Sequence, residues 1–527
     1  MKPSVVRSAV AIGGLVLMAA PLHAQGYNVR LDAWYQSVAY RGWTQDSIPA
    51  SSAQQDANGS WYTPDRIAAR CPAGAVYCTY YSAGPELRGQ PFVSTLDAGL
   101  WGFGVEGLRA KVRARLGTDF SDPLGQGAVD TSLTVWPAVD PTIQLLEGYL
   151  EYGNRLVTAR AGRMNIYSRL GWVGLDGGYA QLRPLGGKLK FGAWGGWGLA
   201  RGTALPVTSP NLDPLGEYRP SVRPTVLGAD AGWAIKGFEG KVTYQAEIDT
   251  DVEKLVGERG AIEMAVRPGA GFTILGSVEH NFGTGKAGGH DIHVRYQDPG
   301  GWVQLIVGER RYVPYFPLWS VWAVFSPQPY STRWGSIALY PLRGLVLRTR
   351  GEAYSYTQGG SVVGTQGEQS AATTGALSGG VEDRGWRWNA GATYSGVRGF
   401  TLDANYHAEY GPGASSHGWD ARLLWAPQKL FSLTVHGGHL LRPLEYRWND
   451  SKVWTIGFRG DLQLRDQLYL NAEVIRYDET RQRPDAAAFS WDQTRFNIGL
   501  TLVFSSQMKT RGLHPAILRI PETRRSR

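Results

Sequence analysis

The sequence is poor in cysteine, methionine and long apolar runs, and each shortage excludes a class of protein. The chain of 527 residues holds two cysteines and five methionines. No run of about 18 consecutive apolar residues occurs in its body, so a bundle of transmembrane helices is excluded. A zinc site built on the two cysteines would need two further ligands, and no CxxCH motif is present to attach haem. No cofactor or metal is therefore predicted.

A surplus of basic residues is concentrated at the two ends of the chain. The formal net charge is +9. Lys2 and Arg7 lie in the first segment, and the residues after Phe504 include six basic side chains against Glu522. Without these two segments the body of the chain is close to neutral. A nucleic-acid partner is therefore not predicted, although a high isoelectric point often indicates one.

The two terminal segments divide the chain into three parts. Residues 1–24 have the pattern of a secretory signal peptide, with two basic residues, an apolar stretch and Leu22-His23-Ala24 before Gln25. An uncleaved N-terminal anchor is the alternative. Residues 25–504 form the body, and residues 505–527 form a basic tail that we expect to be disordered, with a docking peptide or a peptidoglycan contact as the alternatives. Export predicts a loop disulfide between Cys71 and Cys78.

What the body does contain is apolar and polar residues in strict alternation. In LRAKVRARL the apolar side chains share one face of a strand while Arg109, Lys111, Arg113 and Arg115 share the other. On a helix the same residues would be scattered around the cylinder. Similar segments recur from residue 27 to residue 504, and their polar faces carry full charges, which suits a hydrated interior with lipid on the other side.

Connection lengths favour a transmembrane antiparallel β-barrel. We count about 22 strands, and 18 or 20 are alternatives because the segments near residues 173 and 383 could belong to loops. Turns of a few residues alternate with long loops at 42–89, 119–142, 201–222, 312–330 and 358–382. Short periplasmic turns opposite long extracellular loops are typical of outer-membrane barrels. The predicted fold class is therefore all-β.

Two segments resemble known families. The last predicted strand, with Phe496, Ile498, Leu500, Leu502 and Phe504 at alternate positions, resembles the C-terminal signal that the barrel-assembly machinery reads in Gram-negative outer-membrane proteins. It departs from that pattern because the chain continues beyond Phe504. Ala161-Gly162-Arg163-Met164 and Leu175-Asp176-Gly177-Gly178 resemble the GR…DG pairing of alginate-export-type porins, although DG can also mark a turn.

Several motifs that are typical of catalytic or cofactor sites occur in the wrong structural context or are absent. Gly102–Gly107 matches GxGxxG, but a strand follows where a dinucleotide site needs a helix, so the segment is predicted to be a hairpin turn. His290 and His293, like His436 and His439, are three residues apart and would lie on opposite faces of a strand. No HExxH, GxSxG or Walker A sequence occurs. The protein is therefore not predicted to be an enzyme; an outer-membrane hydrolase is the third-ranked hypothesis.

The predicted pore lining consists of charged residues on the inward face. Two interpretations stay open: opposite charges pair within the wall, or the unpaired part of the basic set draws anions into the pore. The residues concerned are Arg109, Lys111, Arg113, Arg115, Glu147, Glu151, Arg348 and Arg350.

The stretch from Arg310 to Tyr330 is unusually aromatic and proline-rich for a loop. A loop this apolar is not expected to lie in water, so we expect it to fold into the barrel and narrow the lumen. Packing on the outer leaflet or on a partner is the alternative. The predicted constriction residues are Arg310, Arg311, Tyr315, Trp319 and Trp322.

Together these patterns predict a porin-like channel in the cell outer membrane for passive diffusion of small hydrophilic solutes, anions among them. The expected partners are outer-membrane lipid, the barrel-assembly machinery and the solute, while a homotrimer and a periplasmic partner stay open. The alternative is a barrel that sheathes a partner, either an exported polymer or an electron-carrying cytochrome.

Overall fold

The computed structural model of the protein describes residues 26–55, 59, 61–65, 67–120, 143–199, 224–249, 253–313, 315, 329–356, 384–411, 414–428, 430–441, 451–481 and 491–506. The predicted signal peptide lies outside these residues, as does the predicted basic tail after Ser506; Ser505, expected in that tail, is the last residue of a strand. Among the described residues, no helix is long and apolar enough to cross a membrane.

The described chain is almost entirely β-strand. The wall of the molecule consists of β1 (Gly26–Pro49), β6 (Pro91–Trp101), β7 (Leu108–Asp119), β8 (Ile143–Gly153), β9 (Val157–Ser168), β10 (Gly171–Leu182), β11 (Leu189–Gly198), β12 (Thr225–Ile235), β13 (Phe238–Asp249), β14 (Lys254–Gly269), β15 (Phe272–Asn281), β16 (Lys286–Gln297), β17 (Val303–Tyr312), β18 (Tyr330–Leu342), β19 (Leu345–Tyr356), β20 (Arg384–Tyr394), β21 (Phe400–Gly411), β22 (Ala414–Gln428), β23 (Phe431–Leu441), β24 (Ser451–Arg465), β25 (Leu468–Arg481) and β26 (Trp491–Ser505). Two single-turn 3₁₀ helices, η1 (Ala50–Ser52) and η3 (Leu185–Gly187), lie in connections.

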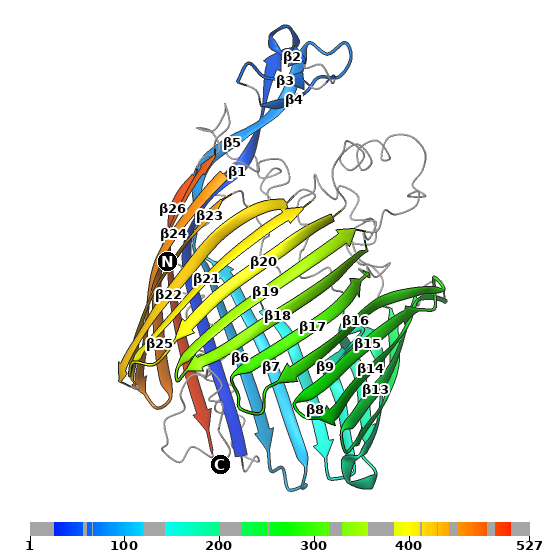
Figure 1. Ribbon diagram of the computed structural model, residues 1–527. Coiled ribbons are helices and arrows are strands. Elements are labelled where there is room, and N and C mark those ends of the chain that lie inside the picture. The colour runs from blue at the N-terminus through cyan, green and yellow to red at the C-terminus, as the bar shows by residue number, and fades with distance from the viewer. Residues whose placement is uncertain are drawn as a thin grey trace.

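These strands close into a barrel of 22 antiparallel strands, which confirms the predicted fold class (Figure 1). Each strand pairs with its neighbour in the sequence, and β1 closes the cylinder because it pairs with β6 on one edge and β26 on the other. The uncertain segments near residues 173 and 383 are the wall strands β10 and β20. The alternative counts of 18 and 20 are therefore wrong.

The predicted loop 42–89 is instead an ordered arm beyond the barrel. β1 continues to Pro49 and pairs there with β5 (Tyr77–Gly89), while β2 (Gln54–Gln55), β3 (Trp61–Tyr62) and β4 (Ala68–Arg70) complete a small sheet at its tip. Figure 1 shows this arm projecting past the end of the wall. A disulfide joins Cys71 to Cys78 in the arm, as predicted. The Tyr80 hydroxyl donates to the Asp46 carboxylate at 3.0 Å, and this bond raises the pKa of Tyr80.

Alternation along the strands gives the wall an apolar face and a charged face. Val242, Ile262 and Val278 lie opposite one another on β13, β14 and β15, and their side chains are 40%, 47% and 49% exposed. The next row around the wall contains Lys241, Glu263, Ser277, Asp291 and Arg310 in register. Because successive side chains of a strand point to opposite faces, these two rows lie on opposite sides of the sheet.

One part of the wall is held by close packing. Gly162, Gly177 and Gly196 form a row across β9, β10 and β11. A Cβ atom at Gly177 would lie 2.1 Å from the Gly195 carbonyl oxygen, so the backbones approach more closely than any side chain allows. A buried apolar cluster lies beside this row and contains Met164, Ile166, Val173, Leu175, Trp194 and Val226.

The short connections are tight turns, as predicted. Only residues 236 and 237 separate β12 from β13, and Gly237 adopts a φ of 77° there. The GxGxxG match forms the turn between β6 and β7, where Gly102, Gly104 and Gly107 all have positive φ. The sequence expectation of a glycine-rich hairpin in place of a dinucleotide site is confirmed.

Candidate solute pathway

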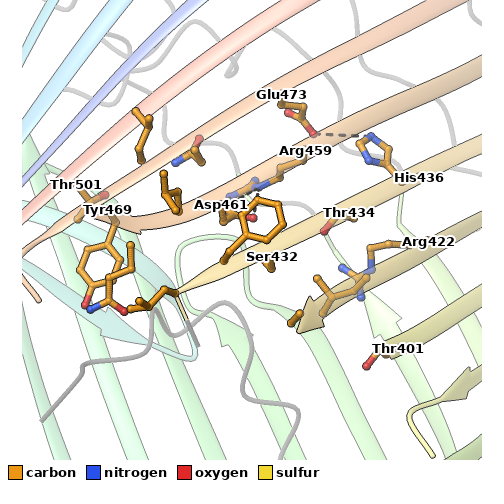
Figure 2. A pocket seen from close by; sticks show the side chains of 18 of the residues that line it. Thr401, Arg422, Ser432, Thr434, His436, Arg459, Asp461, Tyr469, Glu473 and Thr501 are labelled. Atoms are coloured by element: carbon orange, nitrogen blue, oxygen red, sulfur yellow. Dashed lines mark hydrogen bonds and ion pairs between the residues drawn. The ribbon is translucent and has the colours of Figure 1, made fainter. Parts of the chain in front are cut away.

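Charged side chains of the wall border a common cavity, which identifies the charged face as the inner face. The cavity has a volume of about 1030 Å³ and is lined by residues of β1, β6 and β21–β26. These strands follow one another around a wide arc of the closed wall, and their side chains can border one cavity only on the concave side of that wall. Figure 2 shows Arg422, His436, Arg459 and Glu473 among its lining side chains. The lining residues near the short turns are more apolar and include Leu430, Phe431 and Leu462.

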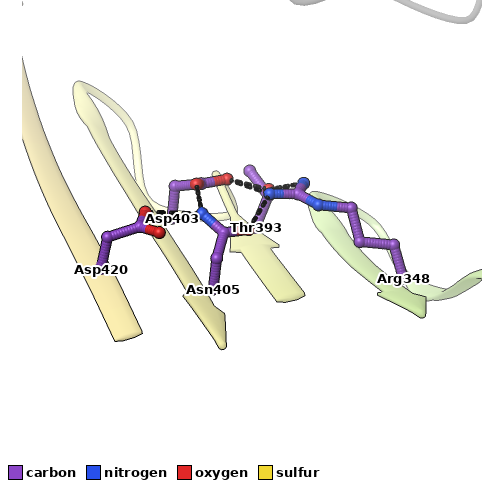
Figure 3. A network of polar contacts seen from close by, with 5 residues as sticks. All are labelled: Arg348, Thr393, Asp403, Asn405 and Asp420. Atoms are coloured by element: carbon purple, nitrogen blue, oxygen red, sulfur yellow. Dashed lines mark hydrogen bonds and ion pairs between the residues drawn. The ribbon is translucent and has the colours of Figure 1, made fainter. Parts of the chain in front are cut away.

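Most charges of this wall are held in local networks. Arg348 on β19 donates from Nη2 to Asp403 at 2.9 Å and to the Asn405 side-chain oxygen at 2.6 Å (Figure 3). Asp403 also accepts from Thr393 at 2.5 Å, and Asn405 donates to Asp420 at 2.9 Å. The network therefore spans four strands and fixes the orientation of each polar group along the inner wall.

Arg348 and Arg350, both predicted to line the pore, share this inner face. Arg350 lies 3.3 Å from Glu352 and its guanidinium stacks 4.1 Å above the Trp334 ring. Glu352 is also 3.4 Å from Arg387, which pairs with Glu409 at 2.8 Å. Both predicted arginines are thus neutralised by wall carboxylates, and for this pair of residues the wall-pairing interpretation is favoured.

The basic ladder of β7 behaves differently. Asp97, which borders the cavity, lies directly opposite Arg113, so the ladder faces the same interior. Lys111 forms an ion pair with Asp97, and Arg115 bonds to the Gln144 side chain. Arg109 and Arg113 make no ion pair within 4.0 Å among the described residues, and both are exposed. Of the four basic residues, only Lys111 therefore has an ion-pair partner among the described residues, because the Gln144 side chain is uncharged, while Arg113 is close enough to Asp32 to interact with it electrostatically.

The expected ion pairs from this ladder to Glu147 and Glu151 do not form. The register does place Glu151 opposite Arg109 and Glu147 opposite Arg113. The Glu151 carboxylate instead binds Arg160 of β9 at 2.6 Å, and Glu147 accepts from the Asn165 amide at 2.8 Å. Each carboxylate thus turns to the strand on its other side and forms no ion pair with the β7 arginine opposite it.

The predicted constriction is described only in part. Arg310 is on the inner face opposite Asp291, whereas its neighbour Arg311 alternates to the outer face, so Arg311 does not line the lumen. The Tyr315 ring lies 3.6 Å from the Arg259 guanidinium of β14, three strands from β17 and on the inner wall. Trp319 and Trp322 lie outside the described residues, and their place in a constriction stays a prediction.

The GR…DG match is a contact within the wall. Arg163 on β9 lies opposite Asp176 on β10, and its Nε and Nη2 donate to the two carboxylate oxygens at 2.7 and 2.9 Å. Gly162 and Gly177 belong to the closely packed glycine row. The alternative that DG marks a turn is therefore wrong, because Asp176 and Gly177 lie in the middle of β10.

The last strand completes the barrel wall. Phe496–Phe504 lie in β26, where Leu500 is opposite Ala33 and Phe504 is opposite Val29 of β1. The alternating residues Phe496, Ile498, Leu500, Leu502 and Phe504 are thus on the strand that closes the cylinder. Their recognition by an assembly machinery stays a prediction.

The paired histidines separate as expected. His436 lines the cavity at 3.7 Å from Glu473, whereas His439 stacks on Trp454 on the other face, with ring centroids 4.1 Å apart. His293 similarly contacts Asp291 on the inner face and His290 contacts Glu309 on the outer one. Within the described ranges no group of three or more His, Cys, Asp or Glu residues is arranged to hold a metal ion.

Comparisons with known proteins agree with the architecture. No family model matches the chain, and no curated protein matches it. Among solved structures, a mutant ferric enterobactin receptor from Pseudomonas aeruginosa, in complex with enterobactin, matches with a TM-score of 0.50 at 11% identity, over 91% of this chain and 81% of that one. The chain has the fold of an outer-membrane β-barrel.

Two porin structures also match across this barrel. The BenF-like porin from Pseudomonas fluorescens Pf-5 has a TM-score of 0.38 at 11% identity and covers 91% of this chain and 98% of its own. OccAB3 from Acinetobacter baumannii has a TM-score of 0.38 at 9% identity and covers 91% and 99%. Neither likeness is to an alginate-export-type porin.

Proposed function

We propose that the protein is an outer-membrane channel for passive diffusion of small hydrophilic solutes. The observation that carries the proposal is the division of one closed wall into two faces. Its outer face exposes large apolar side chains such as Leu150 (57%) and Val307 (66%), which suits lipid contact. Its inner face carries most of the ion pairs and the cavity, which suits a water-filled path.

Anions are the favoured solutes along β7 in this proposal. Arg109 and Arg113 keep their charge exposed to the interior, and the nearby acids bind other partners. Fixed charge beside a confined water path raises the local concentration of counter-ions, so two unpaired arginines are enough to bias flux.

Single-channel recording in planar bilayers tests this function. The purified protein should give ohmic channels, with a reversal potential in a salt gradient that indicates anion preference. Changing Arg109 and Arg113 together to Gln should lower the anion-to-cation permeability ratio about twofold to threefold, because a surface-type charge interaction amounts to less than about 1 kcal/mol. Arg333→Gln is the matched control, since it removes a positive charge from the outer face, where Arg333 lies opposite Glu309.

Two outcomes would contradict the proposal. A barrel that inserts but never conducts is not a channel, and co-purification with a haem protein or a polymer would then support the sheath alternative. An unchanged permeability ratio in the Arg109/Arg113 double variant would leave the channel but show that these two arginines do not set its ion preference.

A further inference from the structure

Arg422 on β22 carries a charge that its surroundings do not balance. It points into the cavity near Thr401 and Thr434 (Figure 2). Two other arginines of the same cavity have aspartate partners: Arg30 at 2.7 Å from Asp32 and Arg459 at 2.9 Å from Asp461. Arg422 makes no ion pair within 4.0 Å in the part of the chain that the structure describes.

The cause lies in the two residues directly opposite Arg422. The register places Asp403 on one side and His436 on the other. Asp403 already accepts from Arg348, Thr393 and Asn405 at 2.9, 2.5 and 2.8 Å, and Arg348 balances its charge. His436 is turned toward Glu473 at 3.7 Å. Both neighbours are engaged with other groups, so the guanidinium remains available to a solute.

Asp420 is the complementary case two residues earlier on the same strand. Its opposite neighbours are Asn405 and Gly438. Asn405 donates to it at 2.9 Å (Figure 3), and Gly438 has no side chain to offer. Within the described residues no cation lies within ion-pair distance of Asp420, which also lines the cavity. A carboxylate with only an amide donor keeps most of its hydrogen-bonding capacity.

The two charges are spaced for one small solute. Residues i and i+2 of a strand share a face and lie roughly 6.6 Å apart, and the long Arg422 side chain can shorten the gap between the charged groups. From these observations we infer that Asp420 and Arg422 form a subsite for small zwitterions. The solute ammonium binds Asp420, and its carboxylate takes the two parallel hydrogen bonds that a guanidinium offers. This inference rests on the proposed channel function.

A solute with one charge gains less at this subsite. An anion on Arg422 is repelled by Asp420, and a cation on Asp420 is repelled by Arg422, because both fixed charges lie within one Debye length. A zwitterion has no such penalty. The hydroxyls of Thr401, Ser432 and Thr434 line the same cavity and can accept or donate to either end of the solute. The predicted class is therefore free amino acids and similar dipolar molecules.

The test compares glycine, acetate and methylammonium as blockers of single-channel ion current in the full-length protein. In the wild type, glycine should reduce the current at a concentration about threefold lower than either singly charged probe. Asp420→Asn should weaken glycine block about threefold and leave acetate block equal or stronger. Arg422→Gln should weaken both. Arg459→Gln removes a paired arginine from the same cavity and should weaken block less than Arg422→Gln, because it changes the cavity charge without removing a group that binds the solute.

Each result decides between the two proposals. Open channels in which glycine blocks no better than acetate, or in which Asp420→Asn leaves glycine block unchanged, overturn the zwitterion subsite while the channel stands. Equal loss in Arg422→Gln and Arg459→Gln also overturns it, because the effect is then one of general cavity charge. A barrel that never conducts overturns the channel and the subsite that rests on it. Recovery of glycine block in Arg422→Lys would support a charge at this position.

Discussion

The wall around β9–β11 and the wall around β19–β22 use the same ladder of backbone hydrogen bonds but are stabilised in different ways. In the first, glycines bring three backbones together beside buried apolar side chains such as Met164 and Leu175. In the second, Arg348, Asp403 and Asn405 connect neighbouring strands through hydrated polar groups. The glycine row of the first region should therefore tolerate no added atom, while the second region should fold with altered charges but change the permeability of the channel.

The largest effect is expected at Gly177. An added Cβ would lie 2.1 Å from the Gly195 carbonyl oxygen, so Gly177→Ala should prevent the wall from closing or cost several kcal/mol. The adjacent Gly178→Ala is the control, because its Cβ would have its nearest neighbour at an ordinary 3.7 Å. Heat modifiability on gels measures the folded fraction. Equal folding of the two variants would show that the close approach is not required.

The sequence predicted the architecture well because alternation is local. The count of about 22 strands and the facing of the β7 ladder were predicted from the sequence, whereas the segments of β10 and β20 stayed open between strand and loop because their alternation is weak. The ion pairs could not be predicted from the sequence. Glu151 has an arginine opposite it on each neighbouring strand, Arg109 and Arg160, and only the side-chain conformations determine that it pairs with Arg160.

The arm and the unbalanced charges show the same limit on sequence-based inference. β5 pairs with the end of β1, although the composition of residues 42–89 is that of a loop. Among the described residues Arg422 lacks an ion-pair partner because the side chains of Asp403 and His436 point to other groups. The sequence of β22 does not show these side-chain orientations. Residues of opposite charge at positions opposite each other on neighbouring strands therefore indicate which face of the sheet is charged. Which of these charges lacks an ion-pair partner depends on the three-dimensional hydrogen-bond network.

A smaller effect is expected at Leu175, which is fully buried in the apolar cluster. Leu175→Ala should reduce the free energy of unfolding by about 2–5 kcal/mol, because the removed atoms leave a cavity. Leu182→Ala, on the same strand but 54% exposed, should cost about 1 kcal/mol or less. Urea titration in detergent or lipid compares the midpoints. Similar losses of unfolding free energy in the two variants would mean that the buried apolar cluster does not stabilise the wall more than an exposed leucine does.

In the hydrated wall, Asp403→Asn should change permeability more than stability. The substitution keeps the shape of the side chain but removes the carboxylate that neutralises Arg348 at 2.9 Å. We expect the anion-to-cation permeability ratio to rise about twofold, consistent with an exposed ion pair. Glu309→Gln removes a negative charge from the outer face and should leave the ratio unchanged. A matching change in both variants would assign the effect to overall charge.

The smallest effect on the barrel is expected from Cys71→Ser with Cys78→Ser. The disulfide lies in the arm, beyond the closed wall, so the unfolding free energy of the barrel should change by less than about 0.5 kcal/mol. The arm itself should be cleaved faster by added protease. A large loss of barrel stability would show that the arm and the wall fold as one unit.

The most direct test measures whether each face of the wall contacts water or lipid. Single cysteines are introduced as Arg113→Cys on the inner face and Leu150→Cys on the outer face, in a background where both native cysteines are serine, and the protein is reconstituted in vesicles. We predict that a charged, membrane-impermeant thiol reagent modifies only the first, and that a fluorophore attached to the second before reconstitution is quenched only by brominated lipid tails. Reagent access to position 150 or lipid quenching at position 113 would contradict the assignment of the two faces.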